Sequence, residues 1–420
     1  MARMDHPAAE ENRVFQIAVV CLVLTALLAY FNLRFIGLPT TIGVMAVALL
    51  LSLGLIGLDR IGFGALHDYE AAFLASIDFS DVLMEGMLSV LLFAGALHVD
   101  LSRLHDYRWQ VGALAVVGTA LSTLIVGAGV WWLLPMVGLS MPFLYCLVFG
   151  SLISPTDPIA VIGILKSAGA PRNVELVVSS ESLFNDGVGV VLFSLLLAIA
   201  TQAHAPSLGD AGMLMLHEAG GGLLLGGILG ALLFVLLRSV NDYKVEVLLT
   251  VAGVLGGYEL AQMLHVSGPL AMVVAGVIIG NHGRALAMSD TTRHHIDMFW
   301  ELLDEILNAV LFVLIGLEIV AIQFPGYMWL AAVVAITVTL AARLIAVGLP
   351  VRLLHRWFRL PDGAWKVLTW GGLRGGISVA LALSLPPGPE RQLILSLTYA
   401  VVVFSILVQG LSIRRVIRSI

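Results

Sequence analysis

Long apolar runs separated by short polar breaks occupy nearly all of the chain. A helix needs about 20 predominantly apolar residues to cross a bilayer, and thirteen runs approach or exceed that length. They are centred near residues 22, 49, 90, 121, 153, 188, 226, 254, 274, 312, 340, 377 and 403. The ninth run, Gly268 to Asn281, is short. The pattern predicts an all-α integral membrane protein with about 13 transmembrane helices.

The composition agrees with this interpretation. Of the 420 residues, 59% are hydrophobic and 12% are charged, whereas about 25% of the residues in a soluble domain are charged. We expect one membrane domain over residues 1–420, embedded in the lipid bilayer, and no nucleic-acid binding. Cys21 and Cys146 lie in separate apolar runs, so buried thiols are expected rather than a disulfide. No cofactor motif or hydrolytic constellation is visible, so we expect no cofactor and no enzymatic activity.

The distribution of basic residues predicts the orientation. Sixteen of the 22 Lys and Arg residues fall after odd-numbered runs or at the C-terminus, and four fall on the other side. The remaining two, Arg343 and Arg374, lie inside runs. Basic residues accumulate in cytoplasmic connections of membrane proteins. We therefore predict a multi-pass protein of the cell (inner) membrane, with its N-terminus outside and its C-terminus in the cytoplasm.

The fifth run is interrupted by a carboxylate between two prolines, in the segment Ser154-Pro155-Thr156-Asp157-Pro158. An ionisable side chain at the bilayer centre costs about 2.5–3.5 kcal/mol on insertion scales, and such residues usually mark ion or proton pathways. Each proline removes a backbone donor and breaks the helix, which is tolerated at membrane depth where the freed carbonyls line a cavity or find other partners.

The twelfth run is interrupted by four glycines around Arg374, between Gly371 and Gly376. The fifth and twelfth helices run in opposite directions because they are seven apart. Paired interruptions in two oppositely oriented halves are typical of transporters with inverted repeats, in which two discontinuous helices cross at the binding site. The alternative is that the glycines only permit close helix packing.

The sixth run carries Glu181, Ser182, Asn185 and Asp186. Glu181 and Asn185 are one helical turn apart, and Ser182 and Asp186 lie on the neighbouring face. Taken alone, an acid such as Asp186 could be a structural ion-pair partner or a neutral acid. Taken with Thr156 and Asp157, these groups predict a site of carboxylate and hydroxyl oxygens. Such ligands suit a hard monovalent cation, namely Na⁺, K⁺ or Li⁺, at Asp186, Thr156 and Ser182.

Four segments together resemble the sodium/proton antiporters of the NhaP type, which are related to animal sodium/proton exchangers. These segments are Ser154 to Val161, Gly169-Ala-Pro, Glu181 to Val188 and Gly371 to Ser378. Their order, spacing and positions in the runs all match. The resemblance covers nearly the whole chain.

The resemblance implies a homodimer with a core bundle, mainly runs 4–6 and 11–13, that moves against a dimerisation bundle formed by the rest. It implies that Asp186 carries the ion and the proton, with Asn185, Thr156 and Ser182 as neighbours. It further implies that Asp157 and Arg374 balance the ends of the half-helices, and that Glu181 pairs with Arg343. Some members of the family have an acid in the third span, where this chain has Ala94; the nearest acid is Glu85.

The residues also suggest a mechanism that does not depend on the family resemblance. Moving Asp186 bare through a dry interior is unfavourable, whereas one cation or one proton removes most of the charge penalty. Competition for one carboxylate predicts obligatory exchange, and Asn185 in place of a second acid predicts electroneutral 1:1 exchange. The alternatives are a K⁺/H⁺ antiporter, a cation channel and a proton-translocating subunit of a redox complex. All three lysines lie in loops, which disfavours the redox subunit.

Further acids occur near the tenth run. Asp304, Glu305 and Glu318 could belong to an ion funnel, but acids near loops are usually solvated. We therefore favour solvated positions for all three.

Overall fold

The computed structural model describes residues 7–60, 87–201, 208–318 and 328–418. Each of the thirteen predicted centres lies in a helix within these ranges, and the described residues form no β-strand. Nine helical segments of the described chain are long and apolar enough to cross a membrane, and two shorter apolar helices accompany them. The prediction of an all-α membrane protein is confirmed, while the exact number of 13 spans stays a prediction. Glu85 lies outside the described residues.

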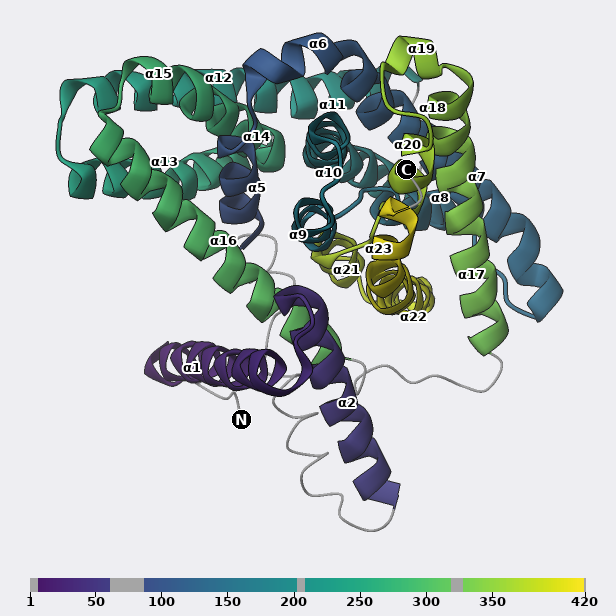
Figure 1. Cartoon of the computed structure of the whole chain (residues 1–420). Helices are drawn as coiled ribbons and strands as arrows, with labels where there is room; N and C mark the ends of the chain where they lie inside the picture. The colour runs from purple at the N-terminus through teal and green to yellow at the C-terminus, as the bar shows by residue number, and fades with distance from the viewer. Residues whose placement is uncertain (1–6, 61–86, 202–207, 319–327, 419–420) are drawn as a thin grey trace.

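One set of helices packs around α16 and is named here the α16 group (Figure 1). Within it, α16 packs against α2 and α13, while α14 packs against α5 and α12. The short ninth run continues through a π-helical turn to Leu286, which makes the segment long enough to span a bilayer. The members are α1 (Pro7–Phe31), α2 (Thr40–Arg60), α5 (Leu88–Leu97), α12 (Gly221–Ser239), α13 (Tyr243–Met263), α14 (Gly268–Ile278), α15 (Arg284–Leu286) and α16 (Asp290–Glu318).

The other helices form the crossing group, which contains both interrupted helices (Figure 1). In it α8 packs against α7 and α10, and α17 packs against α7 and α22. The long members are α6 (Leu101–Gly112), α7 (Thr119–Leu133), α8 (Phe143–Ile153), α9 (Ile159–Ala168), α10 (Arg172–Thr201), α17 (Met328–Arg343) and α22 (Pro389–Phe404). The short ones are α11 (Leu208–Met215), α18 (Leu349–Leu353), α19 (His355–Phe358), α20 (Ala364–Trp370), α21 (Gly376–Leu383) and α23 (Leu411–Ile417).

The two predicted interruptions meet at one point of this group. The first separates α8 from α9, and the second separates α20 from α21. At the crossing the two extended segments run antiparallel, and the backbone N–H of Asp157 donates to the carbonyl of Leu373 at 2.8 Å. This arrangement confirms the prediction of two crossed discontinuous helices.

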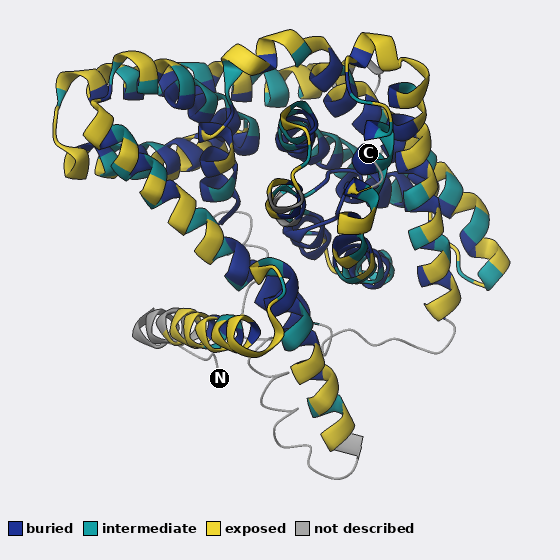
Figure 2. Ribbon diagram, viewed as in Figure 1, coloured by how far each residue is buried: buried dark blue, intermediate teal, exposed yellow. Residues whose placement is uncertain are grey.

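The outer faces of the helices are apolar, as expected of a chain surrounded by lipid. Large hydrophobic side chains such as Leu224, Leu248 and Leu330 are more than 60% exposed. Buried residues are concentrated where α8, α10, α21 and α22 face one another, as the dark blue surfaces in Figure 2 show. Polar side chains in that interior therefore need partners from within the protein.

Candidate ion-binding site

Helix α10 places four polar side chains beside the crossing. Glu181, Ser182, Asn185 and Asp186 are all buried, with exposed fractions between 0% and 6%. The helix packs against α8 and α9 on either side of the first interruption. Successive turns of α10 therefore face the extended segment that carries Thr156 and Asp157.

Asn185 connects α10 to that segment. Its Oδ1 accepts a hydrogen bond from the backbone N–H of Thr156 at 3.1 Å, and its Nδ2 donates to Thr156 Oγ1 at 3.0 Å. The hydroxyls of Thr156 and Ser182 are 2.9 Å apart. Asn185 thus satisfies a backbone donor exposed by the helix break and fixes the side-chain hydroxyl of the same residue.

Glu181 forms a buried ion pair with Arg343, whose guanidinium arrives from the end of α17. Arg343 Nη1 and Nη2 donate to the two Glu181 oxygens at 2.7 and 2.8 Å, and Arg343 Nε donates to the carbonyl of Leu368 at 3.1 Å. Asn185 Nδ2 also donates to Glu181 Oε1 at 2.9 Å. Two-point contact of this kind holds both charges in one geometry.

Arg374 occupies the crossing itself. Its Nη1 donates to the carbonyls of Ser154 and of Pro155, the latter at 2.7 Å. These carbonyls belong to the end of the interrupted helix α8, where partial negative charge accumulates. The backbone N–H of Arg374 donates to Ser405 Oγ at 2.9 Å. The arginine is 2% exposed, so all of this charge is held inside the protein.

The carboxylate of Asp157 lies against the start of α21. A Cβ atom added at Gly375 would lie 2.6 Å from Asp157 Cβ and would overlap its carboxylate, so glycine is needed for this approach. Helix N-termini carry partial positive charge. Asp157 therefore lies at the positive, N-terminal end of α21, and Arg374 lies at the negative, C-terminal end of α8.

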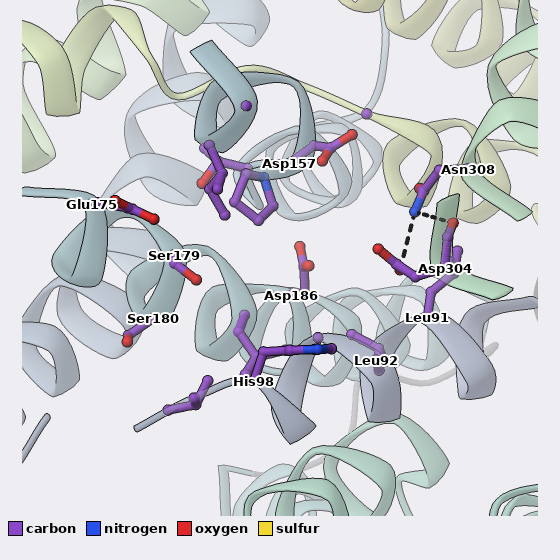
Figure 3. Close-up of a pocket in the computed structure, with 18 of the residues that line it drawn as sticks. Leu91, Leu92, His98, Asp157, Glu175, Ser179, Ser180, Asp186, Asp304 and Asn308 are labelled. Carbon is purple, nitrogen blue, oxygen red and sulfur yellow. Dashed lines mark hydrogen bonds between the residues drawn. The ribbon is translucent and has the colours of Figure 1, made fainter. Parts of the chain in front are cut away.

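Asp186 faces a cavity of about 670 Å³ that reaches the crossing from one side of the molecule. Figure 3 shows its carboxylate near the centre, with Asp157 on one side and Asp304 with Asn308 on another. Within the described residues, the Asp186 carboxylate accepts no hydrogen bond and forms no ion pair. Thr156 and Asp157 also line the cavity, whereas Ser182 and Asn185 lie behind its lining residues.

Nearly the whole chain matches known proteins. A model of the transmembrane sodium/hydrogen exchanger family matches residues 23–419. The chain belongs to the sodium/hydrogen exchanger family. It is 53% identical over 404 residues to the Na⁺/H⁺ antiporter NhaP of Pseudomonas aeruginosa, covering 95% of each chain. It is 36% identical over 386 residues to the Na⁺/H⁺ antiporter NhaH of Halobacillus dabanensis, covering 91% of this chain and 92% of the relative.

A solved structure has the same fold. The sodium proton antiporter MjNhaP1 from Methanocaldococcus jannaschii aligns with a TM-score of 0.75, covering 97% of this chain and 98% of the other, at 17% sequence identity. The family resemblance inferred from the motifs is confirmed. This family member is therefore a multi-pass membrane transporter and not an enzyme.

The third span contributes apolar residues to the cavity of this family member. Leu91, Leu92 and Gly95 of α5 line it, and Ala94 is buried with 1% exposure. The carboxylates nearest the crossing come instead from α10, from the first interruption and from α16.

Helix α16 lines the cavity with three acids, and for two of them, Asp304 and Glu305, a solvated position was expected. Glu301, Asp304 and Glu305 all lie on this wall, followed by Asn308, whose Nδ2 donates to Asp304 Oδ1 at 3.1 Å. Asp304 is only partly exposed on this wall, whereas Glu305 is exposed. The solvated positions expected for these two acids therefore stay a prediction. Glu318 does not line the cavity. The spacing 301, 304 and 308 on one helical face was the signal that could have shown this wall.

Proposed function

We propose that the chain exchanges Na⁺ for H⁺ across the cell membrane, with Asp186 as the shared site. The family and its named relatives support cation/proton exchange. The observation that carries the assignment is the contrast between Asp186, which faces the cavity, and Glu181, which is already paired with Arg343. A carboxylate can exchange one cation for another partner only if no fixed cation neutralises it.

The neighbouring oxygens suit a hard cation. Thr156 Oγ1 and Ser182 Oγ are held together at 2.9 Å, and Asn185 fixes Thr156 from α10. With the Asp186 carboxylate they offer the oxygen ligands that alkali cations prefer. Na⁺ is the proposed substrate, and K⁺ or Li⁺ is the alternative for the same set of ligands.

Exchange follows from competition for one carboxylate. The buried Asp186 can cross between two access states with one Na⁺ or one H⁺, because either removes most of the charge penalty. Each cycle then moves one cation against one proton and no net charge. Asn185, being an amide, adds no second proton to this count.

The two helix groups supply the moving parts. In the proposed mechanism the crossing group, which holds runs 4–6 and 11–13, moves against the α16 group, and the latter forms the contact of a homodimer. The cavity opens toward Arg103, Lys166 and Arg172, which the positive-inside rule places in the cytoplasm. The structure then represents an inward-facing state, with the N-terminus outside and the C-terminus in the cytoplasm.

The test uses purified protein in proteoliposomes that contain a pH-sensitive dye. We expect Na⁺ addition to release protons with saturation, and Asp186→Asn to abolish this exchange while the protein remains folded. Asp106→Asn makes the same chemical change on an exposed loop-proximal position of α6, 73% exposed, and should leave exchange unchanged. Na⁺-driven proton movement by Asp186→Asn would refute the assignment. An uncoupled cation current would support the channel instead, and a competition series with K⁺ and Li⁺ decides the ion.

A further inference from the structure

Helix α16 carries carboxylates on both sides of the crossing. Asp304, Leu311 and Glu318 are spaced seven residues apart, so they lie on one face of the helix at intervals of about 10 Å. Leu311 marks the level of the crossing, because a Cβ atom added at Gly376 would overlap the Leu311 side chain. Asp304 lies toward the cavity, and Glu318 lies at the opposite end. We call this opposite end the closed side.

Three buried polar atoms belong to side chains that are coupled electrostatically through Glu318 on the closed side. They are Glu318 Oε2 from α16, and Arg391 Nε and Tyr399 Oη from α22. Glu318 interacts electrostatically with both Arg391 and Tyr399. In the described part of the chain none of these three atoms has a hydrogen-bond partner. Arg391 Nη2 donates to the carbonyl of Leu383, the last residue of α21, at 2.8 Å, and α21 packs against α16. Tyr399 is 1% exposed.

Such a cluster is unfavourable unless another state uses it. A buried polar atom without a partner costs about 1–3 kcal/mol, and native proteins contain few of them. Here three such atoms belong to side chains of α16 and α22, one helix from each of the two groups. The distances between these residues depend on the relative position of the two groups, so movement of the crossing group would change them.

We propose that Glu318 and Tyr399 form a second cation site on the closed side, which Na⁺ occupies when the crossing group exposes that side. Glu318 supplies a carboxylate oxygen and Tyr399 a hydroxyl oxygen, which suit an alkali cation. Arg391 is the alternative counter-charge for Glu318 when the cation has left. Asp304, with Asn308 beside it, is the corresponding site on the cavity side. This inference rests on the proposed exchange mechanism, because it requires access from both sides.

The two acids provide a matched pair of variants for a sided assay. Right-side-out and everted membrane vesicles present opposite faces of the protein to added Na⁺. We expect Glu318→Gln to raise the half-saturating Na⁺ concentration about tenfold on the closed side only, as for loss of one charge-assisted contact. Asp304→Asn should raise it on the cavity side only. Both variants should retain exchange. If the proposed exchange mechanism is wrong, the unmodified protein will show no Na⁺-driven proton movement, whereas an error in the second-site proposal changes only the variants.

The two variants should affect opposite sides of the membrane, whichever face the cavity occupies. Equal shifts on both sides, or no shift for Glu318→Gln, would overturn the proposal. If Glu318→Gln does not fold, Tyr399→Phe removes only the hydroxyl and should produce a smaller shift on the same side. A shift on the cavity side in that variant would also contradict the inference.

Accessibility gives an independent readout that a purely structural role would not affect. In Glu318→Cys a membrane-impermeant thiol reagent should react from the closed side, and Na⁺ on that side should slow the reaction. Cys21 and Cys146 are buried, so the unmodified protein is the control for background labelling. Asp304→Cys should react from the cavity side. Absence of Na⁺-protected labelling of Glu318→Cys from the closed side would contradict the proposed site.

Discussion

Two carboxylates on helix α10, Glu181 and Asp186, lie five residues apart in very different surroundings. Both are buried. Within the described residues Glu181 accepts hydrogen bonds from two nitrogens of Arg343 and from Asn185, whereas Asp186 accepts none and faces the cavity. Five residues correspond to a rotation of about 140° around a helix. This rotation separates an acid that is paired with Arg343 of α17 from an acid that faces the cavity.

The difference separates a fixed charge from an exchangeable one. A buried carboxylate with a two-point arginine contact is already neutralised. A cation that replaced the arginine at the carboxylate would leave the arginine charge buried without a partner. Asp186 carries no such contact within the described residues, which supports the proposal that a mobile cation or proton neutralises its charge. Asn185 lies between them in the sequence and bonds to Glu181 and to Thr156. These bonds link the Glu181–Arg343 ion pair to the segment that carries Thr156.

The largest expected effect is a difference in stability between two single variants, in which one acid or the other is replaced by its amide. Glu181→Gln leaves the buried Arg343 without its counter-charge, so we expect a loss of about 3–5 kcal/mol in the free energy of unfolding. Asp186→Asn removes an unpaired charge and should not lower stability. Thermal unfolding of the two purified variants in the same detergent measures this difference. Equal stability of both variants, with exchange lost in Glu181→Gln, would instead assign the ion pair to transport.

The next effect concerns the number of protons carried in each cycle. In Asn185→Asp the new carboxylate would lie near Glu181 Oε1, which now accepts from Asn185 Nδ2 at 2.9 Å. Two carboxylates this close do not both ionise, so one holds a proton. We expect this additional acid to make exchange sensitive to voltage. A potassium diffusion potential imposed on proteoliposomes should change the rate of this variant and leave the unmodified protein unaffected. An unchanged rate in the variant would contradict the stoichiometry.

The fold and the centre of the site were predictable from the sequence for simple physical reasons. Apolar runs of bilayer length specify helices, and prolines beside Asp157 or glycines beside Arg374 specify interruptions within them. The polar residues of α10 were predictable because one helical turn separates them. These signals are local, so they need no knowledge of packing.

The remaining part of the site depends on packing between distant segments. Asp304 lies on a helix that also carries exposed charges, and it becomes part of a cavity wall because residues of α9 and α10 line the same cavity. Ser405 bonds to the backbone of Arg374 from 31 residues away, and Gln409 bonds to the carbonyl of Trp370. Nothing in the pattern around Ser405 indicates that it completes a helix break. Partners of freed backbone groups are set by tertiary structure.

The smallest expected effect distinguishes hydroxyl ligands from the carboxylate that they accompany. Ser182→Ala removes one of the two side-chain partners of Thr156 Oγ1, and with it one proposed ligand, but leaves the Asp186 charge in place. A neutral hydrogen bond contributes about 0.5–1.5 kcal/mol, so we expect a roughly threefold to tenfold increase in the half-saturating Na⁺ concentration. The maximal rate should change little. Ser151→Ala on α8 is the control, because its hydroxyl bonds only to the carbonyl of Val148 within its own helix in the described structure. If both variants weaken Na⁺ binding equally, Ser182 acts through helix packing and not as a ligand.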